Sequence, residues 1–282
     1  GSWWLVRLVG CFVVLLLVAA VSRSASAQVF VFQVEGGTVL KQDTYQNPTW
    51  DFVPLQYNYA NPVIVAIPNS NGDHPADFRI RNITGTGFEL TLAEPPSEDG
   101  PHIAMQIAYV AAEAGVWQLP DGTQMAAGFV DTNVVIHKNG GTFVNVALPA
   151  GFNNPIVLTQ IQGLVNEQNN IPAQVSNPFI STAVQNVTNT SFQVALEGCE
   201  CTLGNVALPE KIGWIAIDGN VTSSFVDEDG LLVDYETIRT GNVIPGWSNG
   251  SATVPFSQSY SSTPLFVAKL QTRVSADGGW LR

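Results

Sequence analysis

Two cysteines separated by a single residue are the most chemically distinctive pair in this sequence. Cys199 and Cys201 flank Glu200, and the remaining cysteine is Cys11. A structural zinc site takes four ligands, and no histidine lies near this pair in the sequence, so a metal clip is disfavoured. In an oxidising compartment we expect a disulfide between Cys199 and Cys201 in preference to free thiols, although so short a ring strains the usual geometry.

The densest acidic run offers a candidate calcium site. Asp227, Asp229 and the later Asp234 supply hard carboxylate oxygens of the kind that calcium prefers. The run lacks the full spacing of a helix-loop-helix calcium loop, so an exposed acidic turn is the favoured interpretation. We therefore expect no cofactor, with calcium as the one candidate.

Tyr109 and Trp214 are candidates for binding a sugar, because an aromatic ring with a polar tip offers an apolar face beside a hydrogen-bonding edge. Each stands two residues after an isoleucine, Ile107 or Ile212, in a strand-like segment. Side chains two positions apart share one face of a strand, so filling a core is the favoured alternative for both rings.

No group of residues has the spacing of a catalytic site. The histidines His74, His102 and His137 are scattered, and no Gly-x-Ser-x-Gly elbow accompanies them. Glu94 and Glu98 stand in a proline-rich segment, where solvent exposure is expected. We predict that the chain is not an enzyme.

The charge balance argues against nucleic acid as a partner. The net charge is −12, and removing residues 1–27, which hold Arg7 and Arg23 but no acid, brings it to −14. Phosphate binding needs clustered lysine and arginine. Only 12% of the residues are charged, against about 25% in typical proteins, and the abundance of Gly, Pro, Asn, Thr and Val favours strands and turns.

Residues 1–27 have the layout of a secretory signal peptide. They carry Arg7, an apolar run over residues 8–21 and a small-residue tail, Ser-Ala-Ser-Ala, at residues 24–27. The apolar run is shorter than the ~20 residues that span a bilayer. We expect a secreted, extracellular or cell-surface protein that meets the membrane only during export.

A turn and the strand after it occur twice. Residues 82–92 read Asn-Ile-Thr-Gly-Thr-Gly-Phe-Glu-Leu-Thr-Leu, and residues 186–196 read Asn-Val-Thr-Asn-Thr-Ser-Phe-Gln-Val-Ala-Leu. In both strands the apolar residues alternate, which predicts one face toward a core. Two further blocks recur, a proline block at residues 53–62, 146–155 and 254–264, and a closing strand at residues 107–111 and 212–216. Such recurrence indicates a duplicated domain.

The repeats predict an all-β fold of tandem antiparallel β-sandwiches after the signal peptide, since strand-sized apolar runs recur and no helical stripe appears. The copies are offset by 93 residues at the proline block and by 104 at the turn, so the second copy holds an insertion, assigned to a surface loop at residues 167–179. The third copy predicts a strand at residues 265–268. The predicted parts are a signal peptide at 1–27, sandwiches at 28–118 and 119–222, and a truncated third repeat at 223–282.

The order of these motifs resembles the H-type lectin domain of snail agglutinins and discoidins. The motifs are a Gly-x-x-Asp strand at residues 128–131, the proline blocks, the Asn-x-Thr turn and the closing strand. The resemblance covers nearly all of residues 35–282. It implies a six-stranded antiparallel sandwich, often trimeric, that binds N-acetylgalactosamine or related sugars.

The resemblance also implies a candidate sugar site. The family's site uses an aspartate near the first strand, an arginine shortly before the Asn-x-Thr turn, and a tryptophan or histidine in a loop after the Phe strand. Asp131, with Gly128 of the same motif, matches the aspartate, and Arg79 lies near the place of the arginine. With Tyr109 and Trp214, these residues make up the predicted carbohydrate-binding set.

Five asparagines fit the Asn-x-Ser/Thr pattern of a glycan acceptor, and two of them begin the repeated turn, which explains them without a glycan. They are Asn82, Asn186, Asn189, Asn220 and Asn249.

Three functions remain open from the sequence. The favoured one is a secreted or cell-surface binding protein whose linked copies bind glycans or glycoconjugates with avidity. The first alternative is a structural spacer of an adhesin or surface protein with no ligand. The second is the accessory region of a secreted enzyme whose catalytic part lies beyond this fragment. An oligomer is compatible with each.

Overall fold

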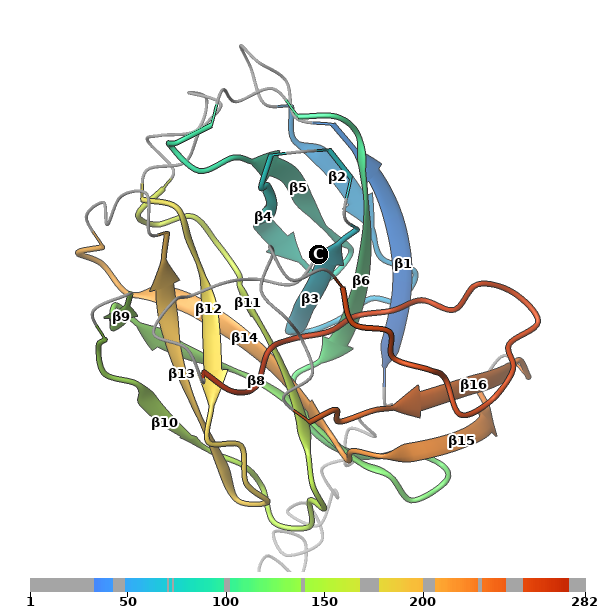
Figure 1. The fold of residues 1–282 in the computed structure, drawn as a ribbon. Coiled ribbons are helices and arrows are strands. Elements are labelled where there is room, and N and C mark those ends of the chain that lie inside the picture. The colour runs from blue at the N-terminus through green and yellow to red at the C-terminus, as the bar shows by residue number, and fades with distance from the viewer. Residues whose placement is uncertain are drawn as a thin grey trace, which may run out of the picture. The chain divides into compact units, whose positions relative to one another are not determined.

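The computed structural model describes residues 33–42, 49–69, 71–72, 74–98, 102–137, 140–167, 178–199, 206–227, 230–241 and 251–273. These residues fall within one compact unit, Gln33–Arg282. Their secondary structure is all β, arranged in several antiparallel sheets without a helix, so the predicted fold class is confirmed (Figure 1). No helix long and apolar enough to cross a membrane occurs among these residues. The predicted signal peptide lies outside them.

The first sandwich consists of two three-stranded antiparallel sheets. One sheet has the order β1-β6-β3 and the other the order β2-β5-β4 (Figure 1). The strands are β1 (Val34–Lys41), β2 (Asp51–Pro54), β3 (Pro62–Pro68), β4 (Asp77–Thr84), β5 (Gly87–Ala93) and β6 (Met105–Glu113). In this order β3 is an edge strand of its sheet.

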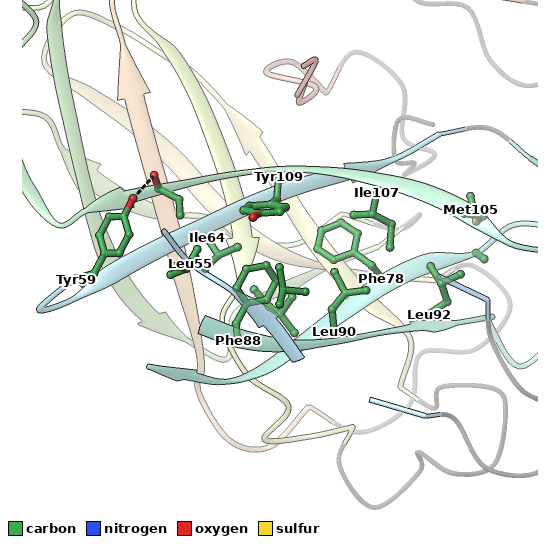
Figure 2. Packing of buried hydrophobic residues seen from close by; sticks show 14 residues of the cluster. Leu55, Tyr59, Ile64, Phe78, Phe88, Leu90, Leu92, Met105, Ile107 and Tyr109 are labelled. Atoms are coloured by element: carbon green, nitrogen blue, oxygen red, sulfur yellow. Dashed lines mark hydrogen bonds between the residues drawn. The ribbon is translucent and has the colours of Figure 1, made fainter. Parts of the chain in front are cut away.

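The core of this sandwich lies between the strands whose alternation the sequence predicted. Figure 2 shows Phe88, Leu90 and Leu92 of β5 facing Ile107 and Tyr109 of β6. All five side chains are buried. Each large apolar side chain removed from water in this way stabilises the fold by about 1.5–3 kcal/mol.

The second sandwich repeats this plan with two additions. Its sheets have the orders β11-β14-β8-β7 and β10-β13-β12, and the short β9 adds to β13 in parallel. Because β7 pairs with β8, residues 115–118 join the sheet of the second sandwich although the predicted boundary placed them in the first. The strands are β7 (Gly115–Gln118), β8 (Gln124–Thr132), β9 (Val135–Ile136), β10 (Val144–Ala147), β11 (Ile156–Ile161), β12 (Ile180–Gln185), β13 (Ser191–Gly198) and β14 (Glu210–Ile217).

The repeated turn has the same structure in both sandwiches. Its first residue adopts a left-handed backbone conformation, with φ of 49° at Asn82 and 50° at Asn186, which asparagine tolerates better than most residues. The Asn82 side chain donates to Glu89 at 3.0 Å, and the Asn186 side chain donates to Gln193 at 2.8 Å. The two sequence copies therefore fold into equivalent local structures.

The part of the chain after β14 differs from the expected third copy. It begins with a hairpin of β15 (Val221–Val226) and β16 (Leu232–Thr237). The prediction of a strand at residues 265–268 is wrong, because the described residues 251–273 contain no strand and pair with none. This segment instead contacts both sandwiches, where Leu265 lies against Gly36 and Gln271 Oε1 accepts a hydrogen bond from the Val157 amide at 2.6 Å.

Candidate functional site

The side chain of Arg79, one of the predicted site residues, makes contacts that join the two sandwiches. Arg79 lies on β4 between Phe78 and Ile80, which face the core of the first sandwich. Its side chain therefore points out of that core, yet it is only 4% exposed. Glu167 and Phe179 of the second sandwich cover it, with Phe179 placing its ring centroid 4.4 Å from the guanidinium carbon.

The Arg79–Glu167 contact is a bidentate ion pair. Arg79 Nε donates to Glu167 Oε2 at 2.5 Å and Nη2 donates to Oε1 at 3.2 Å. Nη1 donates to the Phe78 carbonyl at 2.9 Å. Burial would lower the pKa of Arg79, but the carboxylates of Glu167 and Asp77 outweigh it and raise the pKa, so the guanidinium stays charged.

Asp77 completes this charged group on the β4 side. Its Oδ2 lies 3.5 Å from Arg79 Nη1. Burial raises the pKa of Asp77, and the nearby Arg79 opposes that shift only in part. The guanidinium thus lies between two buried carboxyl groups. Its removal would leave Glu167 without its ion-pair partner and Asp77 with only the nearby Lys269 as a counter-charge.

A second contact between the sandwiches involves Gln162, just after β11. Its Oε1 accepts from the Ile64 amide at 3.0 Å and its Nε2 donates to the Ile64 carbonyl at 2.7 Å. Ile64 lies in the edge strand β3, so this side chain takes the place of a neighbouring strand. Gly213 on β14 makes room, because a Cβ there would lie 2.6 Å from Gln162 Cδ.

We refer to Ile64, Arg79, Gln162, Glu167 and Phe179 as the inter-sandwich joint. A pocket beside the joint is lined by Arg79, Glu167 and Glu210 among others and is about the size of one water molecule, too small for a sugar ring. Glu210 is itself engaged, since it accepts from the amides of Val165 at 3.1 Å and Asn166 at 2.7 Å. The joint therefore links the two sandwiches and has no room for a sugar.

Tyr109 and Trp214 lie in the two cores, where sequence alternation had favoured them. Tyr109 is 6% exposed and Trp214 8% exposed. Their rings meet Phe88 and Phe192 edge to face, with centroids 5.3 and 5.7 Å apart. A sugar stacks on an exposed ring face, so neither ring can bind one in this structure.

Gly128 serves the core in the same way. It is the register partner of Trp214 across β8 and β14. A Cβ at Gly128 would lie 2.7 Å from the indole, so the absence of a side chain is what lets the ring lie there. The Gly-x-x-Asp motif thus has a packing explanation at its first position.

Asp131 is the one predicted sugar-site residue that is exposed. It lies on β8 opposite Lys211 of β14, and Lys211 Nζ lies 5.3 Å from the ring centroid of Phe129. We refer to Phe129, Asp131 and Lys211 as the β8 patch. Arg79 makes its contacts at the joint, so the structure does not bring Arg79 and Asp131 into one site.

The remaining candidates concern sulfur and calcium. Cys199 is disulfide-bonded, whereas Cys201 and Asp229 lie outside the described residues. Asp227 Oδ1 accepts from the Leu231 amide at 2.8 Å, which fits the expected turn between β15 and β16, and Asp234 lies on β16 opposite Ser224. No cluster of three or more metal-ligating side chains occurs in the described ranges.

Sequence reasoning missed Gln162, Glu167 and Phe179. The last two bound the predicted insertion, which was expected to be a surface loop, yet each is only 1% exposed. That insertion was the available signal, because an added segment in one copy provides contacts that the other copy lacks. Residues 168–177 within it lie outside the described residues.

No protein-family model matches this chain, and no solved structure matches it. Among curated proteins it is similar to halomucin of Haloquadratum walsbyi (strain DSM 16790 / HBSQ001), with 29% identity over 250 residues. That similarity covers 83% of this chain and 2% of halomucin, so the chain spans a small part of the length of the protein it matches.

Proposed function

We propose that this chain is a rigid tandem-sandwich segment of a secreted or cell-surface protein, with a structural role. The observation that carries the proposal is the inter-sandwich joint, in which Arg79 is buried by Glu167 and Phe179. The signal-peptide-like residues 1–27 support the location, and the similarity to halomucin is in keeping with it.

The joint supports rigidity because its specific contacts fix one relative arrangement of the two sandwiches. Opening it would break the two Arg79–Glu167 hydrogen bonds and both hydrogen bonds of Gln162 to Ile64. Domains joined only by a flexible linker move independently by default, and a buried, specific contact removes that freedom. A chain of such units would transmit its orientation from one sandwich to the next.

Backbone amide NMR relaxation tests this role. We expect the amides of both sandwiches to report one common rotational correlation time. In an Arg79→Ala/Gln162→Ala double variant, the two sandwiches should tumble with separate, shorter correlation times. The proposal is wrong if the wild-type sandwiches already tumble independently. An Arg81→Ala/Gln106→Ala variant, altered on the first sandwich outside the joint, is the control and should behave like the wild type.

A second candidate function is carbohydrate binding of the H-type lectin kind, and the β8 patch favours it. The partly exposed ring of Phe129 lies near the ammonium group of Lys211, and Asp131 on the same strand is exposed. A sugar could stack on the phenyl ring and form hydrogen bonds with the two charged groups. Each further sandwich would add avidity. A glycan array gives the test, in which binding should be lost in Asp131→Ala and retained in Asp234→Ala. If folded protein binds no glycan on the array, the carbohydrate-binding proposal is wrong and the structural role is the one that remains.

A further inference from the structure

Four described asparagines begin an Asn-x-Ser/Thr sequence, and their side-chain amides divide into two kinds. All four are exposed, so exposure does not separate them: Asn82, Asn186, Asn189 and Asn220. The fifth, Asn249, lies outside the described residues. What separates the four is which atom of the amide the fold uses.

At Asn82 and Asn186 the fold uses the amide nitrogen. Asn82 Nδ2 donates to Glu89 at 3.0 Å and Asn186 Nδ2 donates to Gln193 at 2.8 Å. The hydroxyl two positions later does not separate the sites, because it is hydrogen-bonded in all four patterns: Thr84 and Thr188 each donate to a backbone carbonyl at 3.0 Å, Ser191 Oγ lies 3.2 Å from Thr188 Oγ1, and Thr222 Oγ1 lies 2.7 Å from Ser257 Oγ. At Asn82 and Asn186 the nitrogen that would accept a sugar already makes a hydrogen bond within the turn, which would have to break on modification.

At Asn189 and Asn220 the fold uses the amide oxygen instead. Asn189 Oδ1 accepts from the Asn154 amide at 2.9 Å, and Asn220 Oδ1 accepts from the Arg239 amide at 3.0 Å. The Nδ2 atoms of both make no hydrogen bond to any described residue. Each residue is exposed, and its amide is held in place by its oxygen alone among the contacts to described residues.

We propose that Asn189 and Asn220 carry N-linked glycans in the exported protein and that Asn82 and Asn186 do not. The inference rests on the secreted or cell-surface location in the proposed function. The co-reactant is a sugar joined through C1 to a lipid-linked phosphate. The asparagine nitrogen forms a bond to C1, the C1–O bond breaks, the lipid phosphate leaves with the electron pair, and the amide proton passes to a base.

Peptide mass spectrometry of the protein isolated from its source organism tests the inference. We expect hexose-containing mass additions on the peptides with Asn189 and Asn220, and unmodified peptides with Asn82 and Asn186. An unmodified Asn189 or Asn220 overturns the assignment of that site. Equal occupancy at all four overturns the structural explanation. Joint rigidity is measured on unglycosylated recombinant protein, so either proposal can fail without the other.

Matched variants expressed in the same organism isolate one site. Thr222→Ala removes the acceptor pattern at Asn220 while leaving the Asn220–Arg239 hydrogen bond, and the intact mass should fall by one glycan. Thr222→Ser retains the pattern and should retain the glycan. Thr84→Ala removes the pattern at Asn82, and its intact mass should differ from that of the wild type only by the difference between threonine and alanine. An equal loss of glycan mass in Thr84→Ala would contradict the proposal.

Discussion

At the scale of single residues, the central feature is the buried side chain of Arg79, which links the two sandwiches. Arg79 stands near the place where a lectin of the resembled family would hold a sugar, but its guanidinium contacts Glu167, Asp77 and the Phe179 ring. A buried ion pair gains little over an apolar pair of similar volume, whereas removing one partner is costly because the other charge stays buried. Its role is then specificity of the contact more than net stability.

This difference predicts the outcome of a double-mutant cycle at the joint. Arg79→Met and Glu167→Met alone should each lower the free energy of unfolding by about 3–5 kcal/mol, because each removes the ion-pair partner of a buried charge. The combined variant should recover part of that loss and not all of it, because Asp77 still lacks Arg79 and the Ile180 amide still lacks its Glu167 acceptor. Urea unfolding followed by tryptophan fluorescence measures all three.

Arg81→Met is the control for this cycle. Arg81 pairs with Glu89 at 2.6 Å, but its side chain is 40% exposed, so its loss should cost about 1 kcal/mol or less. Additive effects of the two single substitutions at the joint would contradict the coupling.

At the scale of elements, the β15–β16 hairpin is tied to the turn between β7 and β8. Tyr235 on β16 donates its hydroxyl to Asp121 Oδ2 at 2.6 Å and lies 2.7 Å from Thr123 Oγ1. Partial burial would raise the pKa of Asp121, but hydrogen bonds from Ser223, Tyr235 and Thr123 lower it to about 2. Burial and the same Asp121 bond raise the pKa of Tyr235 to about 12. The hairpin and the turn therefore stabilise each other through the ionised carboxylate.

The pH dependence follows from the direction of the Asp121 shift. Its folded pKa of about 2 lies below the unfolded value of ~3.9, so its contribution to stability is complete above pH ~4 and is lost as the pH falls toward 2. In Tyr235→Phe the pKa of Asp121 should rise toward ~3.9. A carboxyl-carbon NMR titration measures it.

Tyr260→Phe is the control for that titration, because the Tyr260 hydroxyl bonds Gln258 and not Asp121. It should leave the titration of Asp121 unchanged. A pKa of Asp121 that stays near 2 in Tyr235→Phe would remove Tyr235 as a cause of the shift.

The edge strand β3 gives a second prediction at this scale. Gln162→Ala removes the acceptor of the Ile64 amide, and a lost hydrogen bond of about 1 kcal/mol corresponds to a roughly five-fold faster hydrogen exchange of that amide. Exchange at Phe88, in the middle of β5, should be unaffected. Equal acceleration at both amides would indicate general destabilisation rather than the loss of one contact.

At the scale of the whole molecule, how much the sequence could predict depends on how far apart the interacting residues lie. The alternation of Phe88, Leu90 and Leu92 was sufficient for the strand and its buried face, and the repeat was sufficient for two similar sandwiches. The Arg79–Glu167 pair joins positions 88 residues apart. The sequence around either residue does not indicate which residue it pairs with. The strand expected at residues 265–268 was wrong because a strand requires a neighbour, which a local pattern does not provide.

The net charge of −12 predicts a salt response of the whole chain. Raising the salt concentration from 0.1 to 1 M shortens the Debye length from about 10 to about 3 Å. Repulsion among exposed carboxylates should weaken, and the urea midpoint should rise. The Arg79→Met/Glu167→Met variant should respond equally, because its exposed charges are unchanged. A midpoint that falls with salt would mean that exposed ion pairs dominate over repulsion.

The side-chain amide of Gln162 also affects whether the protein aggregates at high concentration. The strand β3 carries the apolar run Val63-Ile64-Val65 at the edge of its sheet, and an uncovered edge of this kind recruits strands from other molecules. By bonding both backbone groups of Ile64, the second sandwich blocks the centre of that edge. The first sandwich expressed alone would lack this cover and should aggregate, so adjacent copies would protect one another's solubility.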